Sequence, residues 1–327
     1  RGAGGGDRIP GPVRRRGRGM SDDFRIDPAR VRRSFGRAAP SYDAAAVLQA
    51  RVRAELLERL DLVRLQPTLV LDLGAGPGQA TIELKRRYKS SQVMALDVAE
   101  GMLREARRRQ TLLRRFQRVC ADAAALPLRD GTADLVFSNL RLQWCNEPEA
   151  VFRECRRVLK PGGLLTFTTF GPDTLVELRR AWAAADGRTH VNRFIDMHDL
   201  GDALLRAGLA EPVMDVERYT LTYAEVRDLM RDLQAIGARN ANAGRPKGLT
   251  GKRALATMVA AYETLRRDGR LPATFEVVYG QAWSPVASPR PAAKGGEVVV
   301  PFSRIGRRVG PDGNRSKDEQ ILKKIMI

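Results

Sequence analysis

Long hydrophobic runs, paired cysteines and histidine are all scarce in this sequence of 327 residues. No stretch of eighteen consecutive apolar residues occurs, so no membrane-spanning helix is predicted. The arginine-rich residues 1–19 lack an apolar core, which argues against a secretory signal. Cys120, Cys145 and Cys155 show no paired spacing, which favours a reducing cytoplasm over a disulfide framework. With only two histidines and no Ser-His-Asp or Cys-His arrangement, neither nucleophilic catalysis nor a metal site is predicted.

Acidic residues are outnumbered by basic ones, and the formal net charge is +19. Part of the excess lies at the ends: residues 1–20 carry six Arg and one Asp, and residues 304–327 carry seven Lys or Arg and three acidic residues. The remainder is still basic. This charge is compatible with an acidic macromolecular partner, and equally with a soluble domain of arginine-rich composition.

The two ends of the chain differ from the rest in composition. Residues 1–19 are rich in Gly, Pro and Arg without apolar periodicity, and Met20 begins a segment typical of a natural start. Lysine is rare, nine residues against 48 Arg, yet three lysines fall within the last eleven residues. We therefore expect residues 1–19 and 310–327 to be disordered or non-native, and residues 20–309 to form one domain.

Apolar segments of two periodicities alternate through the first half of the chain. Apolar residues recur at helical spacing over residues 48–63. Residues 160–163, with the sequence KPGG, are expected to form a turn. Apolar strands separated by helices predict a parallel sheet covered on both faces, a doubly wound α/β fold. Strands are predicted over residues 68–74, 92–97, 118–122, 132–139 and 164–170, and helices over residues 80–88, 99–109 and 148–159.

The pattern changes after Phe170, where helices and strands no longer alternate. Two late strands are expected to complete a seven-stranded, mostly parallel sheet. An insertion over about residues 222–270, together with the N-terminal helices, is expected to form a helical cap over the carboxyl edge of the sheet. The late helices are predicted near residues 173–185, 196–207, 223–236 and 250–267, and the late strands over residues 213–222 and 274–283.

A glycine-rich turn follows the first predicted strand. Gly74, Gly76 and Gly78 form a GxGxG sequence between a strand and a helix, where missing side chains let a ligand approach the backbone. Asp72 directly precedes the turn, where its carboxylate can reach a cationic amino-acid group. Asp97 ends the second strand, 25 residues later, a position suited to ribose hydroxyls. The five positions together predict a nucleoside-containing cofactor.

A further acid and a polar pair extend this pattern. Asp122, followed by Ala123, ends the third predicted strand, where a carboxylate can accept from an adenine amino group. With the Ser138-Asn139 pair after the fourth strand, these features resemble the motifs of class I S-adenosylmethionine-dependent methyltransferases. The glycine spacing departs from the dinucleotide fingerprint, which argues against NAD. The resemblance implies S-adenosylmethionine as the cofactor. It also implies cofactor contacts from Ala75, Met102 and Asn139.

From about residue 31 to residue 308 the sequence is similar to a narrower family, the malonyl-(acyl-carrier protein) O-methyltransferases of biotin synthesis. The resemblance implies that the chain methylates the free carboxyl of malonyl held on an acyl-carrier protein. It is carried by the segments FGRAAPSYDAAA, VLDLGAGPG, SNLRLQWC, FTTFGPDTLVELRRAW, HVNRF, DLQAIGA with GRPKGLTGK, and LPATFEVVYGQAW.

Such a substrate needs little chemical activation. A carboxylate is already an anion, so its attack on a sulfonium methyl requires alignment and desolvation rather than a general base. We expect Arg193 to hold the carboxylate, and Tyr42 and Asn139 to position the reactants. Acyl-carrier proteins are acidic, so a basic run in the cap is expected to dock the carrier. The further substrate-side candidates are His190, Asn192, Gln143 and Trp144, and the docking candidates are Arg245, Lys247, Lys252 and Arg253.

Other functions remain open at this stage. A methyltransferase for a free small acid such as trans-aconitate carries a similar run after its fourth strand, and a methyltransferase-fold arginine hydroxylase or assembly factor shares several late segments. A nucleic-acid methyltransferase is disfavoured because SNLR stands where an NPPY-type tetrapeptide would be required. We expect no nucleic-acid or membrane partner. The oligomeric state stays open, with a monomer as the expectation.

Overall fold

The fold is that of a computed structural model, which describes residues 25–111, 114–186, 188–245, 248 and 251–286. All of these except Val286 belong to one compact unit that ends at Pro285. The predictions for residues 1–19 and 310–327, and for a domain that ends at residue 309, concern positions outside the described residues.

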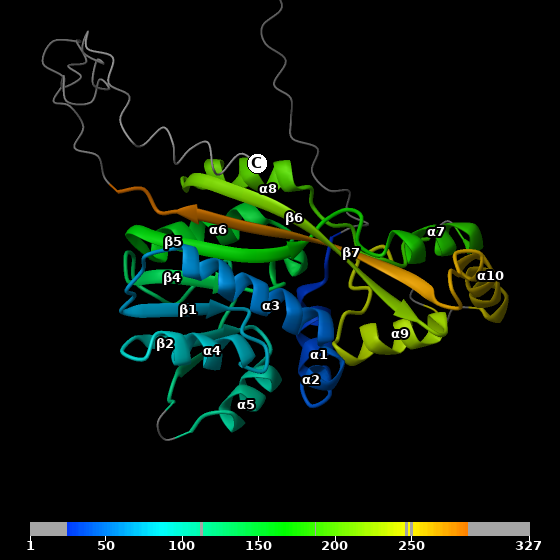
Figure 1. The fold of residues 1–327 in the computed structure, drawn as a ribbon, viewed down its shortest axis with the longest axis horizontal. Coiled ribbons are helices and arrows are strands. Elements are labelled where there is room, and N and C mark those ends of the chain that lie inside the picture. The colour runs from blue at the N-terminus through cyan, green and yellow to red at the C-terminus, as the bar shows by residue number, and fades with distance from the viewer. Residues whose placement is uncertain (1–24, 112–113, 187, 246–247, 249–250, 287–327) are drawn as a thin grey trace, which may run out of the picture. The chain divides into compact units, whose positions relative to one another are not determined.

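Seven strands form one sheet in the order β3-β2-β1-β4-β5-β7-β6 (Figure 1). The first five in this order are parallel, and β7 runs antiparallel to both β5 and β6. The predicted doubly wound sheet, completed by the two late strands, is therefore confirmed. The strands are β1 (Leu69–Leu73), β2 (Gln92–Asp97), β3 (Gln117–Cys120), β4 (Ala133–Ser138), β5 (Leu159–Phe170), β6 (Ala210–Tyr223) and β7 (Leu271–Trp283).

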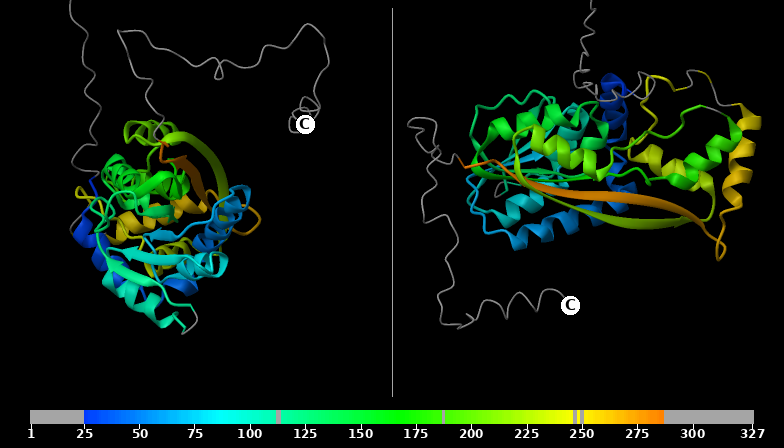
Figure 2. Two further views of the ribbon diagram at one scale, coloured as in Figure 1. Left: turned by 90° about the vertical axis from the view of Figure 1, so that its left-hand side faces the viewer. Right: turned by 90° about the horizontal axis from the view of Figure 1, so that it is seen from above.

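Helices cover both faces of the sheet (Figures 1 and 2). On one face, α3 (Val47–Arg59), α4 (Gln79–Arg87) and α5 (Glu100–Arg108) bury apolar side chains against alternate residues of the central strands. On the other face, α6 (Pro148–Val158) and α8 (Met197–Arg206) do the same with the intervening residues. Both faces of the strands are thus buried, which explains their nearly continuous apolar sequences. None of the described helices is both long and apolar enough to cross a bilayer.

The prediction of a turn at residues 160–163 is wrong. The structure includes these residues in β5, with a shift in register against β4 at this point. Gly162 adopts a φ of +77°, and its amide donates to the Ser284 carbonyl at 2.8 Å. Backbone pairing with the end of β7 therefore keeps this glycine-containing bulge within the strand.

Beyond the carboxyl ends of the parallel strands, a cap is built on the outer halves of β6 and β7, which pair only with each other there. Helices α7 (Val176–Ala185), α9 (Val226–Ala235) and α10 (Lys252–Glu263) pack against this part (Figure 1). α9 and α10 lie within the predicted insertion, whereas α7 precedes it. The N-terminal helices α1 (Pro28–Ala38) and α2 (Tyr42–Ala45) lie between the cap and α5.

Two contacts hold the N-terminal helices in this place. A Cβ atom built on Gly101 of α5 would lie 2.8 Å from the carbonyl oxygen of Gly36 in α1, so the two helices approach closely through glycine. The Ser41 hydroxyl, just before α2, donates to the Ala235 carbonyl at the end of α9 at 3.1 Å. The N-terminal helices therefore join α5, on one face of the parallel sheet, to the cap.

The packing of the sheet is tight at Gly280, which allows a test by substitution. It pairs with Phe167, whose fully buried ring lies over it and contacts Phe152. A methyl group on Gly280 would overlap that ring. We expect Gly280→Ala to lower the free energy of unfolding by about 1–3 kcal/mol, measured by urea denaturation. Gly201→Ala in α8 is the control, because the added methyl meets no atom within 4 Å, and it should not destabilise the protein.

Candidate functional site: a cofactor groove beside a cap pocket

The turn between β1 and α4 is shaped by three glycines with left-handed backbones. Gly74, Gly76 and Gly78 have φ angles of 78°, 54° and 85°, which side chains larger than hydrogen rarely tolerate. The amides of Gly74 and Ala75 donate to the Leu96 carbonyl at 2.7 and 3.0 Å, which fixes the turn against β2. A Cβ atom on Gly76 would meet no protein atom within 4 Å. The space in front of this turn is therefore open to a ligand.

Two buried carboxylates lie beside the turn. Asp97, at the end of β2, accepts from the Gly76 amide at 3.0 Å and from the Ala99 amide at 2.8 Å. Asp72, in β1, accepts from the Thr81 hydroxyl at 2.5 Å. Burial raises the pKa of Asp97 and raises that of Asp72 to about 7. Both acids would gain from a cationic or hydroxyl-bearing ligand that offsets this desolvation.

Hollows on either side of Gly74 and Gly76 form what we call the cofactor groove. One hollow is lined by Asp72 and Arg53, and the other by Asp97 and Met102; Asn139 lines both. The open turn and the two carboxylates fit S-adenosylmethionine, with Asp72 suited to the amino group and Asp97 to the ribose hydroxyls. The groove therefore unites most of the predicted cofactor residues.

Three predicted cofactor residues do not line the groove. Gly78 belongs to the turn but faces Ala106 of α5, and the other two lie beyond β3. Asp122 is exposed, and its carboxylate accepts from the Ala124 amide at 3.0 Å, so it caps its own turn. Ala123 is buried in the core on the opposite face of the sheet from α4. Neither residue lines the groove as the structure describes it. Their contact with adenine stays a prediction, since the Ala124 amide uses one oxygen of the Asp122 carboxylate and leaves the other as an acceptor.

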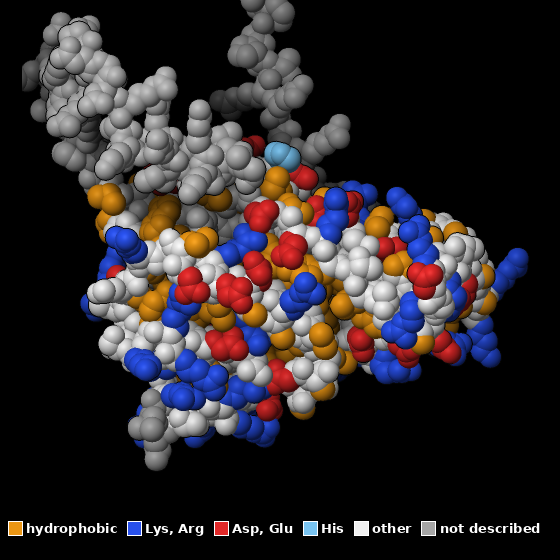
Figure 3. Space-filling view, in the orientation of Figure 1, with side chains coloured by type: hydrophobic (Ala, Val, Ile, Leu, Met, Phe, Trp, Pro, Cys, Tyr) orange, Lys and Arg blue, Asp and Glu red, His pale blue; other side chains and the backbone are white. Residues whose placement is uncertain are grey.

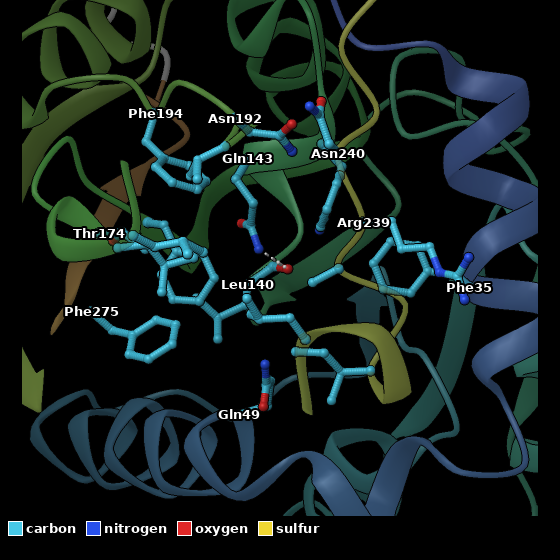
Figure 4. Close-up of a pocket in the computed structure, with 18 of the residues that line it drawn as sticks. Phe35, Gln49, Leu140, Gln143, Thr174, Asn192, Phe194, Arg239, Asn240 and Phe275 are labelled. Atoms are coloured by element: carbon cyan, nitrogen blue, oxygen red, sulfur yellow. Dashed lines mark hydrogen bonds between the residues drawn. The ribbon is translucent and has the colours of Figure 1, made fainter. Parts of the chain in front are cut away.

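A second cavity, the cap pocket, adjoins the groove and encloses about 730 Å³, part of it open to solvent (Figure 4). Four phenylalanines from four different segments line it, with Phe170 in edge contact with Phe194 and tilted against Phe275. Leu178, Leu233 and Ile236 add aliphatic surface. The aromatic lining consists of Phe35, Phe170, Phe194 and Phe275.

Polar side chains enter this apolar pocket from several sides. Gln143, in the 3₁₀ turn η3 (Leu142–Trp144), donates to the Leu140 carbonyl at 2.7 Å and accepts from Thr169. His190 stacks on Trp182 with centroids 3.7 Å apart, and its Nε2 lies 2.8 Å from an Asp186 carboxylate oxygen. These two side chains are held by neighbours in the pocket wall, and their contact with the substrate stays a prediction.

Asn192 differs from them, because its buried Oδ1 has no hydrogen-bond partner within the described chain. Figure 4 shows its amide at the upper side of the pocket, near Gln143 and Asn240. A buried amide without a partner is costly in an apo protein and favours contact with a polar ligand.

Tyr42 lies where the two cavities meet and lines both of them. Burial, followed by the charge of Asp97, raises the pKa of its hydroxyl to about 12, so it stays a hydrogen-bond donor at neutral pH. Leu140 also lines both cavities, and it has a left-handed φ of +50°. The Thr168 hydroxyl bridges the Leu140 amide and the Asn139 Oδ1, both at 2.9 Å. This strained position directs consecutive side chains to the two cavities.

The predicted carboxylate holder, Arg193, does not line the cap pocket; it is exposed, because Val191 and Asn192 occupy the buried positions of this segment. Among the described residues that line the pocket, the arginine is Arg239, in the loop after α9, which the sequence patterns did not select for this role. Figure 4 shows Arg239 on the same side of the pocket as Phe35.

The predicted docking residues are scattered. Arg245 is half-buried, and its guanidinium donates to the Asn242 carbonyl at 3.0 Å. Lys252 and Arg253 are exposed at the beginning of α10 and do not line the cap pocket. Lys247 lies outside the described residues. Trp144, by contrast, lines both cavities and meets Phe35 edge-on at 5.1 Å.

Comparisons with known proteins agree with this geometry. A family model described as a methyltransferase domain matches residues 71–167, the half of the sheet that carries the cofactor groove. A solved methyltransferase structure from Bacillus halodurans superposes with a TM-score of 0.52 at 18% identity, over 72% of this chain and 99% of that one. This likeness concerns the fold alone. The fold and groove define a class I S-adenosylmethionine-dependent methyltransferase, as predicted.

Curated relatives identify the family. A malonyl-(acyl-carrier protein) O-methyltransferase of Laribacter hongkongensis is 55% identical over 86% of this chain and 98% of its own length. The protein of the same name from Xylella fastidiosa is 45% identical over 86% of this chain and 96% of its own. That from Legionella pneumophila is 39% identical over 85% and 98%. The chain belongs to the malonyl-(acyl-carrier protein) O-methyltransferase family.

The raised pKa of Asp72 gives a pH-dependent prediction. Its folded pKa of about 7 exceeds that of an unfolded aspartate, so its burial costs stability progressively as pH rises from about 4 to 7. The carboxylate form binds a cation better, so S-adenosylmethionine affinity should rise over pH 6–8. We expect Asp72→Asn to weaken that affinity at pH 8 by about 10- to 100-fold, and to abolish most of its rise with pH.

Calorimetric titration at pH 6 and 8, with thermal unfolding of the free protein, measures both effects. The variant should unfold at the same or a higher temperature than the parent at pH 8, because it removes a buried charge. Asp199→Asn, at an exposed position of α8, is the control and should alter neither quantity. Equal affinity of the parent and Asp72→Asn at pH 8 would exclude Asp72 from the cofactor site.

Proposed function

We propose that this chain methylates the free carboxyl of malonyl on an acyl-carrier protein, an early step of biotin synthesis carried out in the cytoplasm. The observation that carries the proposal is the junction of the cofactor groove with the cap pocket, where Tyr42 and Leu140 line both cavities. Membership of the family whose curated relatives bear this name supports the substrate.

The reaction asks for positioning rather than for proton transfer. When bound, S-adenosylmethionine supplies an electrophilic methyl group on a sulfonium. The carboxylate oxygen attacks that methyl, the carbon–sulfur bond breaks onto sulfur, and a neutral thioether and a methyl ester result. No proton moves in this step. The protein therefore has to bring the oxygen in line with the methyl and exclude water.

The cap pocket is suited to these two tasks. Its phenylalanine lining makes the wall beside the junction apolar, which disfavours water there. The Asn139 side chain is fixed at both ends, since its Nδ2 donates to the Gln49 carbonyl at 3.2 Å and its Oδ1 accepts from Thr168. This bridge ties β4 to α3 at the junction. A rigid junction keeps the two reactants at a constant separation, which is what an alignment-limited reaction needs.

A second part of the proposal concerns where the carrier docks. Four arginines lie close to one another beside the cap pocket, which one of them, Arg239, lines, and we call them the mouth arginines. Burial, then the charges of Arg245 and Arg239, lower the pKa of Arg30, so these like charges lie close together. The Arg30 Nε also donates to the Asn240 carbonyl at 3.1 Å, which joins α1 to the loop after α9. The mouth arginines are Arg30, Arg33, Arg239 and Arg245.

This cluster is a better docking candidate than basic charge in general. Lys and Arg side chains also gather over α4 and α5 (Figure 3). There, however, Arg104 and Arg108 pair with Glu100 and Glu105 at 2.8 and 2.6 Å. At Arg30, by contrast, the charges of Arg245 and Arg239 act more strongly than the opposite charge of Asp27, and an acidic carrier would relieve this repulsion while its acyl arm enters the pocket.

Mass spectrometry with isotope-labelled S-adenosylmethionine tests the proposed activity. Malonyl-carrier should gain one labelled methyl, and the product should lose it on mild alkaline hydrolysis, as an ester does. Free malonate and trans-aconitate should react far more slowly. Labelling of a free acid at an equal or higher rate would favour the small-acid methyltransferase, and no labelling of malonyl-carrier would contradict the proposal.

Charge reversal tests the docking surface. We expect Arg30→Glu and Arg239→Glu to raise KM for malonyl-carrier about tenfold each at low salt, with the effect shrinking as salt is added. A small malonyl thioester without the carrier should show little change in KM. Arg86→Glu, an equal charge change at an exposed position of α4, serves as the control. Identical KM values for the two variants and the control would remove the mouth arginines from the docking surface.

A further inference from the structure

Gln49 is a buried polar residue at the junction of the two cavities that none of the motifs had singled out. It lies in α3 between Leu48 and Ala50, is 9% exposed, and lines both the cap pocket and the cofactor groove. Figure 4 shows its amide rising from α3 into the pocket. Its backbone carbonyl accepts from Asn139, but its side-chain amide makes no hydrogen bond within the described residues.

The other glutamine of the pocket has the opposite arrangement. Gln143 uses its Nε2 on the Leu140 carbonyl and its Oε1 on the Thr169 hydroxyl. Its amide is therefore occupied by the fold itself. Gln49 keeps both N–H donors available at the place where the substrate's reacting group has to meet the transferred methyl.

The Gln49 amide faces the two cavities, and its atoms are not among the fully buried side-chain atoms of the described residues that lack a partner, so water can reach it in the free protein. A ligand that displaces this water has to bring an acceptor atom, because the N–H donors would otherwise lose their hydrogen bonds. Apolar neighbours on the same helix, Leu48 and Val52, show that a leucine would suit this buried face of α3. The retained polarity therefore indicates a ligand with an acceptor atom.

We propose that the Gln49 amide, together with the Tyr42 hydroxyl, donates hydrogen bonds to the carboxylate that is to be methylated. This inference rests on the proposed function and assigns the residues that hold its nucleophile. Tyr42 lines the same two cavities, and its raised pKa keeps its proton in place. Two donors from consecutive helices, α2 and α3, would fix the carboxylate at the junction.

Neutral donors have a chemical advantage over an arginine in this position. A guanidinium that pairs with the reacting carboxylate offsets its charge and weakens the nucleophile. Amide and phenol groups orient the carboxylate while leaving its charge in place. Two cations line the cavities nearby: Arg239 is exposed at the cap pocket, which suits it to the carrier, and Arg53 in the cofactor groove is already paired with Glu83 at 2.7 Å.

Three variants test the assignment in a labelled-methyl assay on malonyl-carrier. Gln49→Leu keeps the size but removes the donors, and should lower kcat about 10- to 100-fold while S-adenosylmethionine affinity, measured by calorimetry, stays at the parent value. Gln49→Glu should lower kcat further at pH 8, because its carboxylate would repel the carboxylate of the substrate. Its activity should recover towards pH 6, where a protonated glutamic acid can donate. Gln234→Leu, an exposed glutamine of α9, is the control and should match the parent.

The recovery of Gln49→Glu activity towards pH 6 is the decisive measurement, because loss of packing alone would not produce it. Parent-like turnover of Gln49→Leu, or a pH profile of Gln49→Glu that parallels the parent's, would overturn the assignment while the proposed function stands. A parent protein that forms no ester on malonyl-carrier would overturn both. Thermal unfolding of each variant shows whether a loss of turnover reflects unfolding.

Discussion

Everything at this site depends on the divergence of two neighbouring parallel strands. β1 and β4 pair side by side, but the chain leaves β1 towards β2 and leaves β4 towards β5. Their carboxyl ends therefore open a crevice that no crossover helix fills. The glycine turn after β1 forms one wall of this crevice, and the left-handed backbone at Leu140 after β4 forms the other. A single topological feature thus places the methyl donor and the entrance for its acceptor next to each other.

The sheet alone, however, does not close this crevice. The walls of the cap pocket come from α1, from the loop after α9 and from the start of α7, segments that lie far apart in the sequence. They meet because β6 and β7 continue past the carboxyl edge and carry the cap with them. Length in two antiparallel strands is therefore the means by which a nucleotide-binding fold acquires a second, apolar binding cavity.

The sequence predicted the fold and the cofactor turn better than the substrate side. Alternating strands and helices, the glycines and Asp97 are local patterns, and their spacing alone indicates their roles. Gln49 was missed because it lies in an apolar helix that reads as core, although a polar residue on a buried stripe was a detectable signal. Arg193 was favoured because it lies in a family segment, whereas the position of Arg239 at the pocket follows only from tertiary packing. The bulge at Gly162 likewise depends on pairing with a distant strand.

The close glycine contact between α1 and α5 bears on the order of events. α1 supplies Arg30 to the proposed docking surface and Phe35 to both cavities, and Gly36 packs it against the helix that follows Asp97. A carrier bound to α1 would hold that helix down over the nucleoside. Cofactor exchange would then have to take place with the carrier absent, so the methyl donor enters first and its spent thioether leaves last. Turnover would be sequential and ordered, because the bound carrier would keep the cofactor from dissociating.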